Sequence, residues 1–297
     1  MVAPMNPMLE RIVILGAKGQ LGADLLEAFA DVKPIGIERK FVDVEDADAV
    51  AVMMRTHRPT LVVNATAYHQ VDLCELHPER AFAVNALAVD RLAALCALSG
   101  SAFLTVSSDY VFDGTLGRAY REDDMPRPLS VYGASKAAGE MLVPRHGPRY
   151  FIVRTSGLFG HLQSSVKGLT FIERMLRMAE EGKPIRVVDD IVFSPSYTPH
   201  VARAIRAIVE SERFGLYHVT NAGSCSWYEF AAEAFACAGL QPDFQASKTD
   251  PKAGYVRRPA YSPLEGAAMR EAGLPSLPDW RDAVRDYVTH RAPTARS

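Results

Sequence analysis

The sequence predicts an α/β protein with a doubly wound parallel sheet and a smaller lobe built from its C-terminal part. Short apolar runs alternate with longer helical segments over the first half of the chain, as in parallel strands joined by crossover helices. A glycine-rich turn beginning at Gly16 follows the first apolar run and opens the first helical segment. A length of 297 residues leaves room for one large domain with a satellite lobe.

Five apolar runs in the first half are expected to form strands, with helices between them. The strands are predicted at 11–15, 32–37, 60–64, 103–107 and 150–154. The helices are predicted at 20–30, 46–56, 78–98 and 132–142. Pro78 suits the first position of its helix, where a missing N–H costs nothing. The polar stretch 114–128 is expected to be a long surface loop.

The alternation weakens after about residue 156, which predicts a second body. Helices are expected at 170–181, at 200–210 and from the N-cap Ser226 to Ala238, and a strand at 216–220. Pro184 begins an apolar stretch that runs to Val188. A turn is expected at 194–199, a turn-rich stretch at 242–263 and a frayed end at 291–297. We therefore expect an NAD(P)-binding Rossmann domain at 9–156 and a substrate-binding lobe at 157–297. The segment near 198–220 is expected to return to the Rossmann domain, and the cleft between the bodies is the expected site.

Composition and charge exclude several classes of function. The net charge is −2 with no basic block, so no nucleic-acid partner is expected. The four cysteines show no metal or disulfide spacing, so reduced thiols and no metal site are expected. The N-terminal residues lack a secretory pattern, and no run approaches the ~18 apolar residues of a membrane span. A cytoplasmic protein without a membrane partner is therefore expected.

The glycine-rich turn is the first candidate for binding a cofactor. Gly16, Gly19 and Gly22 allow a tight turn, close approach of a pyrophosphate and close packing of the following helix. Gln20 and Leu21 open that helix, whose free N–H groups favour an anion. The alternative is a strand-to-helix turn without a ligand; the strand before it and the helix after it favour dinucleotide binding.

Charged residues at the end of the second strand concern the choice of cofactor. Glu38 could hold a ribose 2′-hydroxyl, whereas Arg39 and the neighbouring lysine could hold a 2′-phosphate. We expect NADPH, with NADH as the alternative and plain surface solvation of these charges as a third. Asp43 and Val44 are expected beside the adenine.

Two further strand ends supply the remaining candidates. Ala65, Ala67 and Tyr68 follow the third strand, and their small neighbours would let the cofactor pass over the sheet edge; a well-packed strand end is the alternative. Ser108 closes the fourth strand, where its hydroxyl could hold a substrate carbonyl or merely cap the loop.

Tyr132 and Lys136 stand four residues apart in Val-Tyr-Gly-Ala-Ser-Lys, and so share one face of a helix. A cation beside a phenol lowers the phenol pKa towards the range in which it can transfer protons. The spacing also occurs by chance in many helices. Together with Ser108 and the glycine turn, it favours a catalytic triad of Ser108, Tyr132 and Lys136.

These residues resemble the extended short-chain dehydrogenase/reductase superfamily, and more closely the dTDP-4-dehydrorhamnose reductase family. The resemblance runs over most of the chain. It is carried by the Gly16 turn, Val63-Asn64-Ala65 to Val71-Asp72, Val84-Asn85, Ser108 to Gly114, Tyr132 to Lys136 with Gly139-Glu140, Arg154-Thr155, Phe171 with Met175-Leu176, Ser226 to Phe230, and Arg258-Pro259 with Leu264.

The resemblance implies NADPH-dependent reduction of the 4-keto group of a nucleotide-linked 6-deoxysugar, dTDP-4-dehydro-L-rhamnose to dTDP-L-rhamnose. Tyr132 would protonate the new alkoxide, while Lys136 would hold the nicotinamide ribose and lower the Tyr132 pKa. Ser108 stands where the family usually has Thr and keeps the hydroxyl. Asp109 and Gly157 would join Ser108 and Tyr132 around the substrate.

Three positions depart from the family pattern. The family often has an aromatic residue where this chain has Gly157. Its Asp-Gln-x-Gly-x-Pro-Thr run is matched here by 190–196, in which Ile191 replaces Gln and Phe193 replaces Gly. All three lie where sugar or nucleotide is expected, so the identity of the substrate stays open.

Two other functions remain as alternatives. A nucleotide-sugar epimerase of the same superfamily would use the same Tyr and Lys. Dehydration is disfavoured, because Asp109 is followed by Tyr110 rather than by a second carboxylate. A non-catalytic regulatory subunit, similar to the beta subunit of methionine adenosyltransferase, is the third hypothesis. The superfamily also allows a homodimer.

Overall fold

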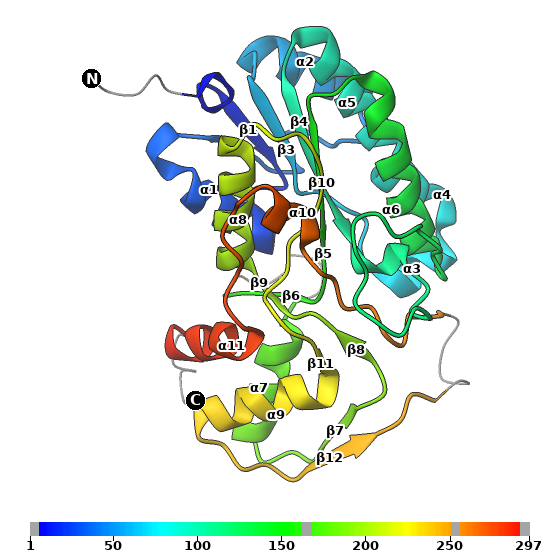
Figure 1. Ribbon diagram of the computed structural model, residues 1–297, viewed down its shortest axis with the longest axis vertical. Coiled ribbons are helices and arrows are strands. Elements are labelled where there is room, and N and C mark those ends of the chain that lie inside the picture. The colour runs from blue at the N-terminus through cyan, green and yellow to red at the C-terminus, as the bar shows by residue number, and fades with distance from the viewer. Residues whose placement is uncertain (1–5, 162–167, 251–255, 292–297) are drawn as a thin grey trace.

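The computed structural model describes residues 6–161, 168–250 and 256–291. At its centre is a parallel six-stranded sheet with the order β10-β5-β4-β3-β1-β2 (Figure 1). Its strands are β1 (Ile12–Leu15), β2 (Ile35–Ile37), β3 (Leu61–Asn64), β4 (Ala102–Ser108), β5 (Tyr150–Thr155) and β10 (Gly215–His218). The strand order reverses between β1 and β3, so a ligand crevice is expected outside the carboxyl ends of these strands. The predicted Rossmann-type α/β class is confirmed.

Helices cover both faces of this sheet. On one face α1 (Gln20–Ala28) packs against α8 (Thr198–Glu210), over a core that includes Leu25 and Ile205. The other face carries a second core, with Val50 and Leu92 at its centre. The helices on that side are α2 (Ala47–His57), α3 (Val71–Leu76), α4 (Pro78–Phe82), α5 (Ala88–Ser99) and α6 (Val131–Leu142).

The predicted helix at 78–98 forms as α4, a π-helical segment (Ala83–Leu87) and α5 in succession. Pro78 occupies its first turn, and Gly100, with φ of 73°, ends it. By length and composition this stretch, Pro78–Ser99, could cross a membrane, contrary to the expectation from sequence. Half of its most apolar window is buried inside the protein, against the sheet and α6.

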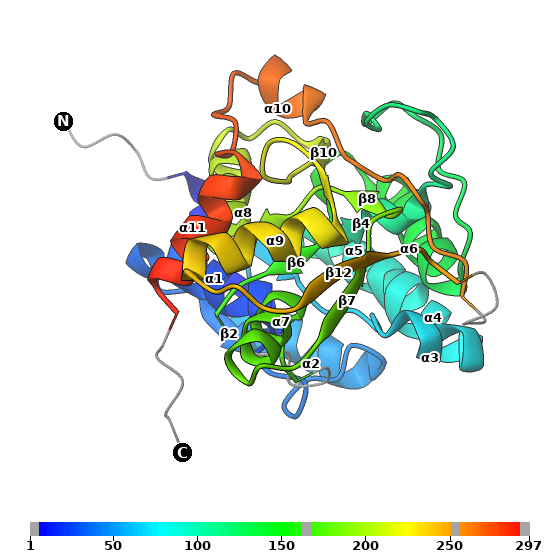
Figure 2. The same ribbon diagram turned by 90° about the horizontal axis from the view of Figure 1, so that it is seen from below.

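A second body, called the lower body below, lies under the carboxyl ends of the sheet in Figure 1, and Figure 2 views the molecule from that end. Its core contains Phe159, Ile172, Phe230 and Trp280. Its helices are α7 (Phe171–Glu180), α9 (Trp227–Ala238) and α11 (Trp280–Thr289), and α10 (Ala267–Glu271) lies beside β10. Its strands are β6 (Leu158–Phe159), β7 (Ile185–Val188), β8 (Val192–Phe193), β9 (Ser196–Tyr197), β11 (Cys225–Ser226) and β12 (Phe244–Ser247).

Local signals explain several helix starts. Asp46 caps α2 by accepting from the backbone N–H groups of Asp48 and Ala49. Ser226 caps α9, as predicted, and the Glu229 side chain accepts from the Ser226 backbone N–H in a capping box.

Several predicted boundaries are wrong. The second strand begins at Ile35 rather than Val32, because Ala30–Val32 forms a 3₁₀ turn closed by Lys33 with φ of 52°. The stretch expected to be turn-rich contains β12, which pairs in parallel with β7. The turn expected at 194–199 contains β9 and the first turn of α8.

The first residue of the predicted frayed segment, 291–297, is held in place. Arg291 was expected to fray, but its guanidinium donates to the carboxylates of Glu173 and Glu180 on α7. The remainder of that segment, 292–297, lies outside the described residues.

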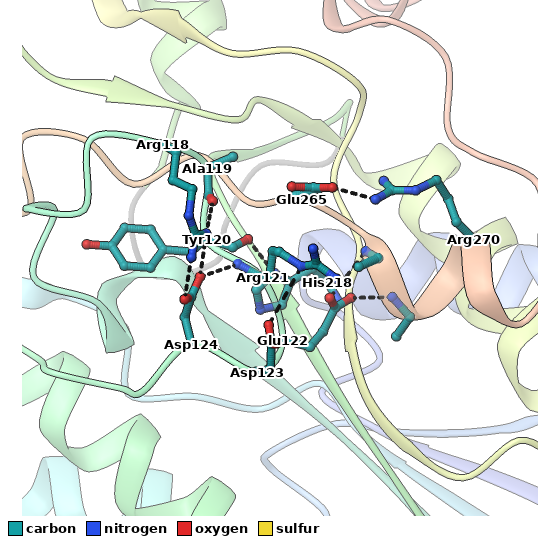
Figure 3. A network of polar contacts seen from close by, with 12 residues as sticks. Arg118, Ala119, Tyr120, Arg121, Glu122, Asp123, Asp124, His218, Glu265 and Arg270 are labelled. Carbon is teal, nitrogen blue, oxygen red and sulfur yellow. Dashed lines mark hydrogen bonds and ion pairs between the residues drawn. The ribbon is translucent and has the colours of Figure 1, made fainter.

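The loop at 114–128 is tied down at its centre rather than free on the surface. Tyr120 is buried, stacks on Phe112 at 4.0 Å between ring centroids, and exchanges backbone hydrogen bonds with 263–265. Glu122 accepts from the backbone N–H of His218 and from the first N–H groups of α10 (Figure 3). The loop therefore joins β10 to α10.

Candidate active site

A cavity of about 970 Å³ lies at the carboxyl ends of the sheet, between the sheet and the lower body. Its lining contains all the predicted site residues but one. Those that line it are Gly16, Gly19, Gln20, Leu21, Arg39, Asp43, Val44, Ala65, Ala67, Tyr68, Ser108, Asp109, Tyr132, Lys136 and Gly157. The exception is Gly22, which lies in the first turn of α1.

The glycine turn has the shape that a pyrophosphate needs. Gly16 adopts φ of +79°, and a Cβ there would meet the Ala65 carbonyl oxygen at 3.0 Å. A Cβ on Gly22 would collide with the Gly16 carbonyl, so Gly22 sets the close packing of α1 on the turn. Gly19 is the N-cap of α1 and supplies no side-chain cap, which leaves the first N–H groups of the helix for an anion.

Exposed cations surround the end of β2. Arg39 is paired with Asp43 through two hydrogen bonds of 3.0 Å and lies 3.6 Å from Glu45. Lys18 and Lys40 both pair with Glu38, and the hydrogen bond from Lys18 is the main cause that lowers the Glu38 pKa. Sequence reasoning missed Lys18, which the fold brings from the glycine turn to the end of β2.

The turn after β3 is fastened to the helix that carries Tyr132. Asn85 accepts from the Tyr68 backbone N–H at 2.9 Å, and its amide donates to the Tyr68 carbonyl and to Ser135 on α6. A Cβ on Gly139 of α6 would collide with the Asn85 carbonyl, so α6 and the π-helical segment that contains Asn85 approach closely. Asn85 thus couples the predicted cofactor turn to the predicted catalytic helix, a role that its spacing alone did not reveal.

Ser108 and Tyr132 meet in the cavity, as the sequence predicted. Burial raises the Tyr132 pKa, and a hydrogen-bonding interaction with Ser108 acts in the opposite direction. Tyr110 packs edge-on against Tyr132 at 5.7 Å between ring centroids. Burial is the largest influence on the Tyr132 pKa in the free protein, and the expected lowering of that pKa by Lys136 stays a prediction.

Lys136 lies one turn further along α6, and its ammonium donates to the Val106 carbonyl at 2.6 Å. Burial lowers the Lys136 pKa to about 8, opposed by the charge of Glu140. Glu140 accepts three hydrogen bonds from Arg154 of β5, the shortest 2.7 Å. This buried ion pair anchors α6 to the sheet one turn beyond Lys136.

Several polar groups near Ser108 have partners, and others have none. The buried Asp109 carboxylate accepts from Ser262 at 2.6 Å and from Ser108 at 3.0 Å, and burial raises its pKa. Ser107 and Thr155 are buried at the cavity on neighbouring strands, and their hydroxyls lack a hydrogen-bond partner within the described residues. A buried hydroxyl left unpaired costs about 1–3 kcal/mol, so a polar ligand fits here.

No group of three or more histidine, cysteine, aspartate or glutamate side chains in the described ranges could hold a metal ion. The residues present do fit a dinucleotide: an uncapped helix start, a glycine cradle, cations at the end of β2 and unpaired hydroxyls in the cavity that Tyr132 also lines.

Comparison with known proteins assigns the chain to a family. The family model described as "RmlD substrate binding domain" matches residues 10–292. The chain is 33% identical to dTDP-4-dehydrorhamnose reductase of Aggregatibacter actinomycetemcomitans, with 94% of this chain and 98% of that protein covered. The chain belongs to the dTDP-4-dehydrorhamnose reductase family.

Two further family relatives are similar over nearly their whole length. The spore coat polysaccharide biosynthesis protein SpsK of Bacillus subtilis is 35% identical, with 96% of this chain and 99% of that protein covered. The crystal structure of dTDP-4-dehydrorhamnose reductase from Bacillus anthracis, in complex with NADP, superposes with a TM-score of 0.89 at 33% identity. It covers 94% of this chain and 99% of that one.

Two of this chain's departures from the family pattern form one structural feature. Gly157 adopts φ of +50°, and a Cβ there would overlap the ring of Phe193. The Phe193 ring therefore occupies the space that a side chain at position 157 would need. Ile191, the third departure, also lines the cavity.

Proposed function

We propose that the chain reduces the 4-keto group of a dTDP-linked 6-deoxysugar with NADPH, and that it converts dTDP-4-dehydro-L-rhamnose to dTDP-L-rhamnose. The observation that carries the proposal is the meeting of Ser108, Tyr132 and Lys136 in one cavity with an uncapped helix start. The names of the relatives support the sugar and the cofactor.

The chemistry assigned to the protein is proton transfer and orientation. NADPH, when bound, supplies the hydride for the carbonyl carbon. The Ser108 hydroxyl, which donates to Asp109 in the free protein, turns its proton to the carbonyl oxygen of the substrate. The Tyr132 phenol beside it donates its own proton to the developing alkoxide. Burial raises the Tyr132 pKa and so keeps the phenol protonated at neutral pH, which is the form that a reduction consumes.

Lys136 has a positioning and electrostatic role in this proposal. Its ammonium uses one of three donors on the Val106 carbonyl, which leaves two for ribose hydroxyls and the phenol oxygen. Its charge favours the phenolate that remains after proton transfer. Lys18, Arg39 and Lys40 would receive the 2′-phosphate, by exchanging their present carboxylate partners for it.

The remaining assignments are proposals of the same standing. We assign cofactor binding to 9–156 and substrate binding to 157–297, supported by the separate core of the lower body, while β10 pairs with β5 in the main sheet. We propose a cytoplasmic enzyme without a membrane or nucleic-acid partner, and the net charge of −2 supports the absence of a nucleic-acid partner. A homodimer is the proposed assembly.

The test is NADPH oxidation by the purified protein, followed by absorbance with a panel of dTDP-4-keto-6-deoxysugars. The proposal expects stoichiometric NADPH consumption with dTDP-4-dehydro-L-rhamnose. The panel includes dTDP-4-keto-6-deoxy-D-glucose, because a Streptomyces niveus relative, 34% identical, is named for reduction of that sugar. Sugar conversion without net NADPH consumption would instead identify an epimerase, and no oxidation with any sugar would favour a regulatory subunit.

A further inference from the structure

One side of the cavity is an aromatic wall, formed by Phe193 of β8 and Trp227 at the start of α9. Their rings stack with centroids 4.0 Å apart and planes 22° apart. Phe171 packs edge-on against Trp227, with ring centroids 4.6 Å apart. Phe193 is only 3% exposed, whereas Trp227 is partly exposed, and both line the cavity. Trp227 therefore presents the larger exposed surface, and the nearly buried Phe193 ring stacks on it.

The wall depends on a missing side chain. Gly157 lies in the turn between β5 and β6 with φ of +50°, and its absent Cβ would overlap two carbons of the Phe193 ring. Since interiors are close-packed, a side chain at Gly157 would displace that ring and, through the stack, Trp227. Gly157, Phe193 and Trp227 are thus mechanically one unit.

Two connections place this wall beside the reacting centre. Gly157 follows β5 by two residues, and Thr155 of β5 is in register with Ser108 of β4. On the other side, Val192 exchanges backbone hydrogen bonds with 260–262, and the Ser262 hydroxyl donates to Asp109, the residue after Ser108. The part of a ligand that lies against the wall is therefore the part that lies near Ser108.

We propose that Trp227 receives the apolar face of the substrate's sugar ring, and that Phe193, seated over Gly157, is the positioning residue that fixes Trp227 for this contact. The ligand's identity rests on the proposed function. The reacting carbonyl is on the sugar, so the sugar lies near Ser108 and against the wall. Stacked aromatic rings are rigid and offer an apolar face, which suits a deoxysugar. The nucleotide lies further away and does not depend on this unit.

The experiment measures binding of dTDP-L-rhamnose and of dTDP by calorimetry, with NADP present, because the two ligands differ only in the sugar. The variants are Phe193→Ala, Gly157→Ala and the double variant. The matched control is Phe244→Ala, which removes a stacked ring of the same body, 4.2 Å from Tyr228, that does not line the cavity. Affinity for dTDP reports that each variant is folded.

We expect Phe193→Ala and Gly157→Ala each to weaken dTDP-L-rhamnose about tenfold, while dTDP binding stays within about twofold, as for a pocket that loses one well-packed group. The affinity of the double variant for dTDP-L-rhamnose should fall by less than the product of the two single fold-losses, since the Cβ added at position 157 no longer meets a ring. In turnover, KM for the keto sugar should rise more than kcat falls. Phe244→Ala should change neither affinity.

Unchanged affinity of Phe193→Ala for dTDP-L-rhamnose, or an equal loss of affinity for dTDP, would overturn the proposal that the aromatic wall binds the sugar. A wild-type protein that binds dTDP-L-rhamnose but reduces no keto sugar would refute the proposed function alone, and the comparison of the two ligands would still decide the wall. A wild-type protein that binds neither ligand would refute both.

Discussion

At the scale of single residues, Tyr132 and Lys136 share a face of α6 but have different surroundings. The phenol lies beside Ser108, and the ammonium is held by the Val106 carbonyl. Burial moves both pKa values against the charged form, upward for Tyr132 and down to about 8 for Lys136. In the free protein the phenol is therefore a proton donor, while the lysine charge is sensitive to mildly alkaline pH.

The variant Tyr132→Phe should keep NADPH affinity within about twofold and lose about 10²–10⁴-fold in kcat, the usual range for a missing general acid. It removes one hydroxyl and keeps the packing against Tyr110. Binding is measured by fluorescence titration and turnover by NADPH absorbance. Turnover that matches the wild type would remove Tyr132 from the mechanism.

Activity should fall as the pH rises through about 8, because Lys136 loses its proton there. The sign follows from burial: a lowered pKa makes the charged form the one present below pH 8 and the neutral form the one above it. The measurement is the pH dependence of kcat/KM, which reports groups of the free enzyme. A flat profile between pH 7 and pH 9 would contradict the assignment of Lys136.

At the scale of elements, three cations gather at the end of β2, namely Lys18, Arg39 and Lys40. Each is paired with a carboxylate in the free protein. The pairs are exposed, so they are worth little to stability and can exchange partners readily. Their proposed function is to read the 2′-phosphate of NADPH.

Arg39→Ala should weaken the binding of NADPH about tenfold, because a charge-assisted hydrogen bond to the 2′-phosphate is lost. The affinity for NADH should change less than twofold. Arg55→Ala is the control, since Arg55 is an exposed arginine of α2 that does not line the cavity. Dissociation constants for both cofactors are the measurement. Equal losses for NADPH and NADH would show that Arg39 does not read the phosphate.

Trp227 is the first residue of α9 and directly follows the N-cap Ser226. Replacing Ser226 with Ala should lower the free energy of unfolding by about 1 kcal/mol, because the Glu229 N–H loses its acceptor. Chemical denaturation measures this, with Ser224→Ala as a nearby control outside the cap. An unchanged midpoint would mean that the capping box contributes nothing.

Local patterns predicted elements well where a strand ends in glycine or a helix begins at a capping side chain. Gly16, Pro78 and Ser226 each mark a boundary that follows from backbone chemistry alone. Lys33, with its positive φ, and β12, which needs β7 beside it, could not be found in this way. Pairings between distant segments are decided by tertiary packing, which a single sequence does not show.

The same limit applied to the site. Ser108, Tyr132 and Lys136 were found because their spacing carries chemistry, and the structure brings them to one cavity. Lys18 and Asn85 were missed because their partners are far away in sequence or on other elements. The contact of Gly157 with Phe193 joins positions that the sequence presented as separate departures.

At the scale of the whole molecule, the cavity is bounded by the sheet above and the lower body below, and several links hold the two together. Gln20 of α1 donates to the Gly160 carbonyl at 3.2 Å, directly beside the glycine turn. Ser262 of the lower body donates to Asp109, which follows β4, at 2.6 Å. Within the upper body, a buried chain of hydrogen bonds runs from Arg154 of β5 through His218 of β10 to the Tyr120 carbonyl. Burial, with the charge of Arg154, lowers the His218 pKa to about 3, so the imidazole stays neutral and this chain does not loosen over the physiological pH range.

The most direct test of the proposed reduction is the fate of deuterium from labelled NADPH when the protein acts on dTDP-4-dehydro-L-rhamnose. We expect one deuterium at C4 of dTDP-L-rhamnose for each NADPH consumed, and loss of both the label and NADPH consumption in Tyr132→Phe. Mass spectrometry and NMR of the product give the answer. Product formed without net NADPH consumption, or with no label at C4, would contradict a reductase centred on Ser108, Tyr132 and Lys136.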